Sequence, residues 1–235
     1  MEAIVQLSGV SKRYGEGELT VQALQEVDLT LERGAFAAVV GPSGSGKTTL
    51  LNMLGALDRP DAGQVHVEGR EITRLSRAAQ ARLRLQRIGF VFQAYNLLPV
   101  LTAYENAEYV LLLQGVRAPE RRRRVLALLE RVGLAGLADR FPHQLSGGQQ
   151  QRVAVARAIA SEPALVLADE PTANLDSRTG AALIDLMVEL NQEKGTTFLF
   201  STHDQHVMSR ARQLLLLTDG RITYAGNYAG YALLP

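Results

Sequence analysis

The chain has 235 residues, of which 46% are hydrophobic and 21% charged, and its formal net charge is +1. This length and apolar content allow one large or two small globular units with a substantial core, and they exclude a disordered chain. The balanced charge provides no basic field, so no nucleic-acid partner is expected. The sequence contains no cysteine, which excludes disulfides and thiolate metal sites.

Neither the N-terminal residues nor the apolar runs indicate export or membrane insertion. Met1 to Gln6 lacks the basic and then apolar pattern of a leader. The longest apolar stretches are shorter than the roughly 18 residues that a membrane span needs. We therefore expect a soluble, cytoplasmic chain.

The chain is predicted to begin with strands. Ile4 to Val10 and Val21 to Leu31 alternate apolar with polar residues, which is typical of half-buried antiparallel strands. Ala35 to Val40 is a continuous apolar run that suits a buried parallel strand. A glycine-rich loop follows, and Thr48 to Leu54 after it is predicted to be a helix.

This loop reads Gly41-Pro-Ser-Gly-Ser-Gly-Lys-Thr48 and matches the pattern G-x-x-x-x-G-K-[ST]. Its glycines let successive N–H groups point inward at phosphate oxygens, and the N-terminus of the following helix favours anions. We expect Lys47 to reach the β- and γ-phosphates and the Thr48 hydroxyl to ligate Mg²⁺. The alternative is a glycine-rich turn with a chance lysine.

The middle of the chain changes from strands to helices. Gly63 to Gly69 is a hairpin-like strand, Arg77 to Arg87 a helix, and Ile88 to Phe92 a strand that ends at Gln93. Residues 94–144 show no strand pattern and are predicted to form a helical insert in an α/β domain. Its expected helices are Tyr104 to Gln114, Glu120 to Val132 and a short piece near Leu137.

The run of arginines from Arg121 to Arg124 lies at the start of one of these helices. It is interpreted as a solvated helix face, and an interaction patch is the alternative.

A second anion-binding turn is predicted at Leu145-Ser-Gly-Gly-Gln149, which opens a helix that continues to Ala160. Ser146 is placed as its N-cap, and the two glycines allow close backbone approach. One loop already holds phosphates within this chain, so a second site makes sense if it faces a different nucleotide. An ordinary start of a helix is the alternative.

Two carboxylates end the next apolar strand, Ala164 to Ala168, at the edge where open α/β sheets bind ligands. Asp169 suits Mg²⁺ through coordinated water, and Glu170 can orient and polarise an attacking water as a general base. Capping of the following loop is the alternative. An amphipathic helix, Ala181 to Glu193, and a buried strand, Thr196 to Ser201, are predicted next.

These motifs, in this order, resemble the nucleotide-binding subunit of ATP-binding cassette (ABC) transporters over essentially the whole chain. The resemblance implies a P-loop α/β fold with a mostly parallel core sheet, an antiparallel β subdomain and a helical subdomain. It implies a single domain, 1–235, with 94–144 as the helical subdomain and with 1–93 and 145–235 as the β-rich and nucleotide-binding core. ATP hydrolysis is implied, with ATP and Mg²⁺ as cofactors and a head-to-tail homodimer that sandwiches two ATP molecules.

Matching positions give further residues their expected roles. Tyr14 would stack on adenine, Gln93 would touch Mg²⁺ and the water, and His203 would contact the γ-phosphate. Asp176 would lie in a loop that links the two sites across the dimer. Without the resemblance, Tyr14 is a packing aromatic and Gln93 a surface residue, and His203 with His206 could suggest a metal pair.

The expected site therefore comprises three sets of residues. The catalytic set is Lys47, Gln93, Glu170 and His203. The metal set is Thr48, Gln93 and Asp169. The nucleotide-binding set is Tyr14, Gly41, Pro42, Ser43, Gly44, Ser45, Gly46, Lys47, Thr48, Thr49, Ser146, Gly147, Gly148, Gln149 and Asp176.

Two segments resemble the lipoprotein-releasing and macrolide-export branch of the family: Phe90 to Asn106, and Gly15 to Leu24 after Tyr14. This resemblance implies a separate membrane-embedded permease subunit and a cassette that is peripheral on the cytoplasmic face of the membrane. It also implies that ATP-driven closure performs mechanical work. The side chains of Tyr95, Leu97, Leu98 and Pro99 are interpreted as part of a docking groove, with packing on their own domain as the alternative.

Three classes of function compete at this point. The leading one is an ATPase subunit that drives a membrane partner. A non-transport ABC ATPase is disfavoured by the lack of a long coiled coil and of cysteines, and a binding module without turnover by the presence of Lys47, Glu170 and His203. Lipoprotein release, drug or peptide efflux and force transmission to cell-wall enzymes stay open, and residues 219–235 are given no function.

Overall fold

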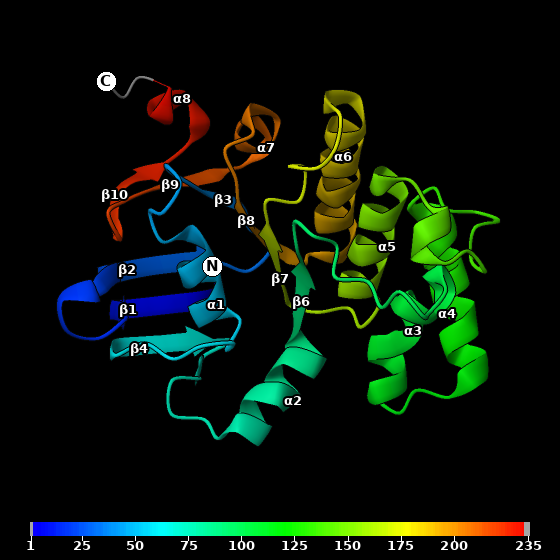
Figure 1. Ribbon diagram of the computed structural model, residues 1–235, viewed down its shortest axis with the longest axis horizontal. Helices are drawn as coiled ribbons and strands as arrows, with labels where there is room; N and C mark the ends of the chain where they lie inside the picture. The colour runs from blue at the N-terminus through cyan, green and yellow to red at the C-terminus, as the bar shows by residue number, and fades with distance from the viewer. Residues whose placement is uncertain (1, 233–235) are drawn as a thin grey trace.

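Two β-sheets organise the chain in the computed structural model, which describes residues 2–232 (Figure 1). The first sheet is antiparallel, with strand order β2-β1-β4-β5. Its strands are β1 (Ala3–Tyr14), β2 (Val21–Glu32), β4 (Ala62–Val67) and β5 (Arg70–Glu71).

The second sheet has six strands in the order β10-β9-β3-β8-β7-β6. Neighbours from β9 to β6 pair in parallel, and β10 is an antiparallel edge strand. The strands are β3 (Phe36–Val40), β6 (Ile88–Val91), β7 (Leu165–Asp169), β8 (Thr197–Ser201), β9 (Gln213–Thr218) and β10 (Arg221–Gly226).

The helices lie on both sides of this second sheet (Figure 1). They are α1 (Lys47–Leu54), α2 (Arg77–Arg87), α3 (Ala103–Leu113), α4 (Ala118–Arg131), α5 (Gly147–Ile159), α6 (Ser177–Lys194), α7 (Gln205–Arg210) and α8 (Tyr228–Tyr231). Short 3₁₀ turns occupy Gly17–Leu19 and Pro142–Gln144. None of the helices among residues 2–232 combines the length and the apolar character required to cross a bilayer.

The alternation of side chains along β3 divides the core into two halves. Ala37 and Val39 pack with α1 and the antiparallel sheet, whereas Phe36, Ala38 and Val40 pack with α3 to α7 on the other face. All five residues are buried, because β3 is a central strand covered on both faces. This burial accounts for its continuous run of apolar side chains. These layers confirm the predicted fold class of a mostly parallel core sheet with an antiparallel sheet and added helices.

Some predicted elements differ from the structure. The expected short helix near Leu137 is wrong, because Gly133 and Gly136 both adopt a φ of +75° and residues 134–140 form turns. Strand β1 continues to Tyr14 rather than ending at Val10, and α6 begins at Ser177 because Asp176 caps it. The hairpin of β9 and β10 was not predicted, although its Asp219-Gly220 turn has positive φ at both residues, as such a hairpin requires.

The aromatic cluster beneath the second sheet tests this core. The Phe36 ring centroid lies 4.7 Å from that of Phe200 and 5.8 Å from that of Phe198, and all three side chains are buried. Phe36→Ala should lower the free energy of unfolding by about 3–5 kcal/mol, because it leaves a cavity between two rings. Urea unfolding followed by circular dichroism measures the change.

Leu19→Ala is the matched control, since the Leu19 side chain is 83% exposed. Its effect should stay within about 0.5 kcal/mol. An equally small effect of Phe36→Ala would contradict this description of the core.

Candidate functional site

The glycine loop joins β3 to α1 and packs closely against the backbones of β9 and β2. A Cβ atom on Gly41 would lie 2.1 Å from the Leu217 carbonyl oxygen, and one on Gly46 would lie 2.3 Å from the Ala23 carbonyl oxygen. Both residues also have positive φ, of +150° and +105°. The loop therefore keeps its curled backbone only with glycine at these two positions.

The inner side of this loop presents polar groups. Gly46 is the N-cap of α1 and has no side chain to occupy the first N–H groups of the helix, so these groups can bind an anion. The Ser45 hydroxyl is buried without a hydrogen-bond partner among the described residues. Pro42, Ser43 and Gly44 form the exposed rim.

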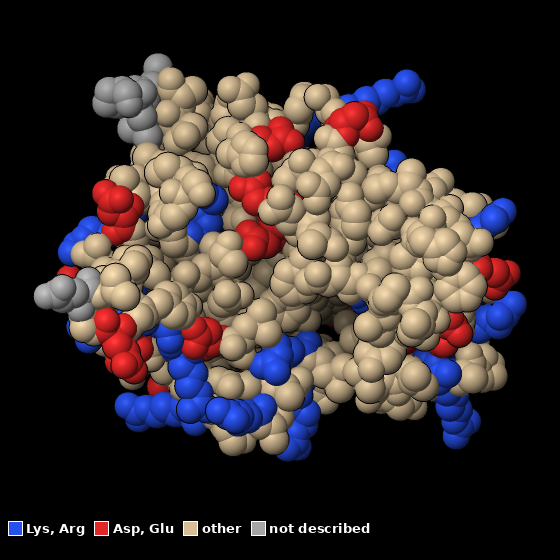
Figure 2. Space-filling model, viewed as in Figure 1, with Lys and Arg blue, Asp and Glu red and all other residues tan. Residues whose placement is uncertain are grey.

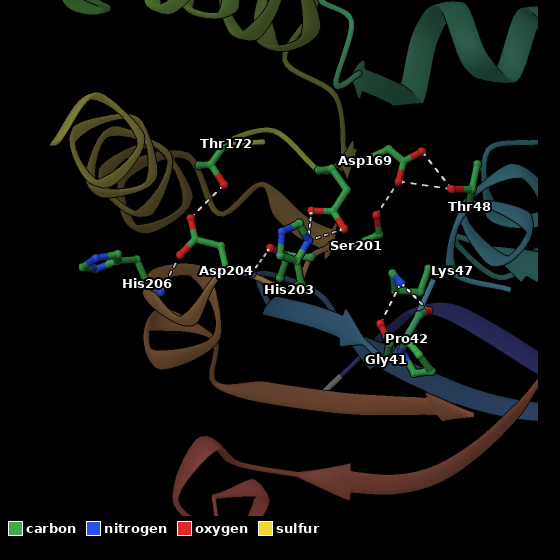
Figure 3. Close-up of polar contacts among 12 residues, drawn as sticks. Gly41, Pro42, Lys47, Thr48, Asp169, Thr172, Ser201, His203, Asp204 and His206 are labelled. Atoms are coloured by element: carbon green, nitrogen blue, oxygen red, sulfur yellow. Dashed lines mark hydrogen bonds and ion pairs between the residues drawn. The ribbon is translucent and has the colours of Figure 1, made fainter. Parts of the chain in front are cut away.

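Lys47 folds back over the loop (Figure 3). Its Nζ donates hydrogen bonds to the carbonyl oxygens of Gly41 at 2.8 Å and Pro42 at 2.9 Å. The ammonium group thus lies where the loop curves, which is the position from which it can contact phosphate oxygens.

Asp169 brings the loop and two core strands together. The Thr48 hydroxyl donates to Asp169 Oδ2 at 3.1 Å, and the Ser201 hydroxyl donates to Asp169 Oδ1 (Figure 3). Ser201 faces Asp169 because β7 and β8 pair in parallel at these residues. Sequence reasoning missed Ser201, although the end of its strand was predicted.

The oxygen atoms of Thr48 and Asp169 suit Mg²⁺, which prefers hard oxygen ligands. The described residues contain no group of three or more His, Cys, Asp or Glu side chains that could form a metal cage. Mg²⁺ commonly binds through one or two carboxylates and keeps its waters, so this sparse donor set fits it.

Glu170 follows Asp169 in a constrained conformation. Its φ is +46°, which is uncommon for a residue with a long side chain, and its N–H donates to the Ser201 carbonyl oxygen at 3.0 Å. The carboxylate lies 3.0 Å from His203 Nδ1 and is mostly buried, whereas the His203 side chain is 75% exposed. The structure therefore pairs two of the expected catalytic residues.

His206 does not join this pair. In Figure 3 its ring points away from His203, and its backbone N–H donates to Asp204 Oδ1 at 2.8 Å. The other oxygen of Asp204 accepts from the Thr172 hydroxyl at 2.8 Å. Asp204 therefore caps α7 and ties it to the segment after Glu170.

Gln93 lies apart from these groups. Its side chain is exposed and makes no hydrogen bond to Thr48 or Asp169, which leaves its expected metal role as a prediction. Its carbonyl oxygen accepts from Asn174 Nδ2 at 2.9 Å. The buried Gln151 donates to the carbonyl oxygens of Pro171 at 2.8 Å and Phe92 at 3.5 Å.

Tyr14 ends β1 with its side chain 41% exposed. Its hydroxyl donates to Asp58 Oδ2 at 2.8 Å, and Lys12 Nζ lies 5.1 Å from the ring centroid. Burial and the neighbouring Asp58 raise the pKa of Tyr14, against a smaller opposing effect of Thr49. Polar contacts therefore hold the ring while much of it stays open to a ligand.

The turn at 145–149 is organised by a capping box. The Ser146 hydroxyl accepts from the Gln149 N–H at 3.3 Å, and Gln149 Oε1 accepts from the Ser146 N–H at 2.9 Å. A Cβ atom on Gly147 would lie 2.8 Å from Tyr95 Oη, and one on Gly148 would lie 2.5 Å from Thr179 Cγ2. Both glycines are thus required by close packing.

This turn and the glycine loop are not joined by any hydrogen bond or ion pair within residues 2–232. Asp176 likewise contacts its own helix, since its Oδ1 accepts from the Thr179 N–H at 3.0 Å. The Thr179 hydrogen bonds lower the pKa of Asp176. The structure therefore separates the expected nucleotide-binding residues into two groups on one chain.

The docking role expected for Tyr95, Leu97, Leu98 and Pro99 stays a prediction. Leu97 packs against the core, and none of Tyr95, Leu97, Leu98 and Pro99 lines the apolar hollow beside them. That hollow has a volume of about 390 Å³ between α2, β6 and α3, and its apolar lining includes Leu85, Phe90, Tyr109, Val110 and Leu113. Two of these lining side chains on α3, Tyr109 and Leu113, are exposed.

Comparison with protein families matches residues 24–173 to the family described as "ABC transporter". The chain is 42% identical to the lipoprotein-releasing system ATP-binding protein LolD of Shewanella sp. (strain MR-4), and the match covers 97% of this chain and 99% of LolD. It is 45% identical to the macrolide export ATP-binding/permease protein MacB of Sodalis glossinidius over 93% of this chain. The chain spans about a third of that relative, since the match covers 33% of its length.

Among solved structures, a dimeric ATP-binding cassette in a post-hydrolysis state, bound to ADP and Pi, has a TM-score of 0.89 to this chain. The two are 42% identical, and the match covers 95% of this chain and 98% of that one.

The close approach of Gly148 to Thr179 gives a test of the packing between α5 and α6. Gly148→Ala should destabilise the protein by about 1–3 kcal/mol, because its new methyl group would overlap the Thr179 methyl. Thr179→Ser removes that methyl and keeps the N–H that Asp176 binds. Urea unfolding of the single and double variants measures the coupling.

Thr179→Ser should recover most of the stability lost in Gly148→Ala. Purely additive effects of the two substitutions would show that α5 and α6 are not in contact at this point.

Proposed function

The chain belongs to the ABC transporter family, and we propose that it is the ATP-hydrolysing subunit that energises a membrane subunit of the lipoprotein-releasing or macrolide-exporting kind. The observation that carries this proposal is the convergence of Lys47, Thr48, Asp169, Glu170 and His203 at the carboxyl edge of the second sheet. ATP and Mg²⁺ are the proposed cofactors.

The glycine loop and Lys47 would hold the phosphates of ATP, with Tyr14 and Thr49 nearer the nucleoside. Thr48 and Asp169 would hold Mg²⁺, which when bound neutralises charge on the phosphate oxygens. Catalysis of this kind depends mainly on positioning and on charge stabilisation, and the side-chain contacts around Asp169 support both.

Glu170 is the proposed general base. Its carboxylate would orient a water molecule in line with the γ-phosphate and accept its proton. His203 holds that carboxylate at 3.0 Å and is exposed, so it can turn towards the phosphate that develops charge. Gln93 would complete the site by moving towards the metal and the water.

We further propose that ATP closes a homodimer. The turn at Ser146–Gln149 would face the nucleotide of the second copy, and Asp176 would lie between the two sites. The separation of this turn from the glycine loop within one chain supports the arrangement. The similar cassette bound to ADP and Pi is described as dimeric, which supports it as well.

The membrane subunit is proposed to be a separate chain, with the cassette at the cytoplasmic face of the membrane. Its cytoplasmic segment would occupy the hollow between α2, β6 and α3, where Tyr109 is 40% and Leu113 56% exposed. Arg84 and Arg157 also line this hollow, and no carboxylate among its lining residues neutralises them. Figure 2 shows further Lys and Arg side chains gathered along the edge that carries α2.

This charge pattern favours an apolar segment that carries a carboxylate. The lining also includes Asn96, three residues after Gln93, so the occupant of the hollow would touch the loop that carries Gln93. The nature of the exported cargo depends on the membrane subunit.

Glu170→Gln tests the hydrolytic site and the dimer together. Turnover of ATP should fall about 10²- to 10⁴-fold, because the amide cannot accept the proton of the water. The variant should then accumulate as a dimer with ATP and Mg²⁺, which light scattering after size-exclusion chromatography measures.

Adding Lys47→Ala to Glu170→Gln provides the control, since loss of the ammonium group should weaken the hold on ATP and return the protein to a monomer. A monomeric Glu170→Gln protein at saturating ATP would refute the proposed sandwich. Undiminished turnover in that variant would remove Glu170 from its role.

Leu113→Asp tests the docking hollow. The carboxylate should abolish association with the membrane subunit, because it places a charge on the apolar lining. Leu112→Asp is the matched control, since Leu112 is 48% exposed on the same helix and does not line the hollow. Each variant is purified from detergent-solubilised membranes of the native host in the Glu170→Gln background, and the bound proteins are identified by mass spectrometry.

A membrane-embedded subunit should accompany Leu112→Asp and be absent with Leu113→Asp, while ATP-dependent dimerisation is kept by both. Equal recovery with both variants would exclude this hollow as the docking site.

A further inference from the structure

The loop that carries Gln93 is held by side chains from outside it. We define the Gln93 loop as residues 92–96. The Phe92 carbonyl oxygen accepts a hydrogen bond from the Gln151 side chain, and the Gln93 carbonyl oxygen accepts one from the Asn174 side chain. Two further carbonyl oxygens, of Tyr95 and Asn96, accept from Arg157 at 2.9 and 2.5 Å.

Arg157 holds the most strained part of the loop. Tyr95 and Asn96 are consecutive residues in the left-handed region, with φ of +60° and +49°. The left-handed conformation is costly for a bulky residue such as Tyr95 and persists only where the surroundings impose it. The Arg157 guanidinium can bridge both carbonyl oxygens because its N–H groups form a planar fork.

The environment of Arg157 is unusual for a charged side chain. It is partly buried, and burial lowers the pKa of its guanidinium, which nevertheless stays protonated in proteins. No carboxylate within residues 2–232 lies at ion-pair distance from it. The two loop carbonyl oxygens are therefore the groups that compensate its desolvation.

The same loop also contacts the turn at the start of α5. Tyr95 Oη lies so close to Gly147 that a Cβ atom there would come within 2.8 Å of it. Arg157 lies ten residues further along α5, which is about 15 Å along a helix. The Gln93 loop thus contacts one rigid helix at two separated points.

We propose that Arg157 is a positioning residue that fastens the Gln93 loop to α5, so that Gln93 and the Ser146–Gln149 turn move as one unit. This inference rests on the proposed function for the role of Gln93 in the ATP site. Arg157 and Asn96 also line the docking hollow, so an occupant of the hollow acts on the pair of carbonyl oxygens that Arg157 holds.

Arg157→Met tests the proposal, with Arg152→Met as its matched control. Arg152 is also a partly buried arginine on α5, but it donates to the Val132 carbonyl oxygen at 2.8 Å, away from the Gln93 loop. Arg157→Met should lower kcat about 10- to 100-fold, because a displaced Gln93 misplaces the metal and the water. It should also raise the Mg²⁺ concentration needed for half-maximal activity, while the Kd for ATP without Mg²⁺ is unchanged.

Arg152→Met should leave kcat and the Mg²⁺ requirement near those of the wild type. If both variants fold and their kcat and Mg²⁺ requirement agree, the positioning role is refuted. If the wild-type chain itself shows no ATP hydrolysis, the proposed function fails and the reason lies outside Arg157.

Arg157→Lys provides a second measurement that preserves the charge and does not depend on activity. The single ammonium group cannot bridge both carbonyl oxygens in the same plane. Amide hydrogen exchange in residues 92–97, read by mass spectrometry, should therefore be faster than in the wild type, and Arg152→Lys should leave it unchanged. Unchanged exchange in Arg157→Lys would overturn the proposal.

Discussion

The parallel pairing of β3, β8 and β7 is the constraint on which the site depends. Parallel strands end at one edge of the sheet, so the glycine loop after β3, Ser201 at the end of β8 and Asp169 at the end of β7 must meet there. The hydrogen bonds of Asp169 to Thr48 and Ser201 close this edge. Thr48 and Asp169, which are more than a hundred positions apart, are thereby brought together by backbone pairing and joined by a side-chain hydrogen bond.

Sequence patterns could predict the parts of the site that are local. The glycine loop and the two carboxylates at the end of β7 follow from backbone geometry and strand direction, and each lies at the place in the fold that its motif predicts. The short helix near Leu137 failed because apolar residues with helical spacing were interrupted by Gly133 and Gly136, whose positive φ breaks a helix. The hairpin of β9 and β10 was missed although its Asp-Gly turn is a strong local signal.

Contacts between distant segments could not be predicted in this way. Gln151, Asn174 and Arg157 each donate to carbonyl oxygens of residues far away in the sequence, and nothing in their own neighbourhood indicates which oxygens those are. The steric need for Gly148 likewise depends on Thr179, a residue of another helix. A motif therefore indicates that a residue matters, whereas only the fold shows which neighbour makes it necessary.

These long-range contacts connect the hollow between α2, β6 and α3 with the carboxyl edge of the second sheet. The docking hollow is lined by Arg157 and Asn96, and the Gln93 loop leads from there towards the carboxyl edge of the sheet. Asn174 ties the same loop to the segment that follows Glu170, so a shift of the loop would reach Glu170, the proposed base, as well as Gln93. In the proposed function, a bound permease segment and a bound nucleotide would therefore act on one strained loop, and each would change the affinity of the other through the free energy of that loop.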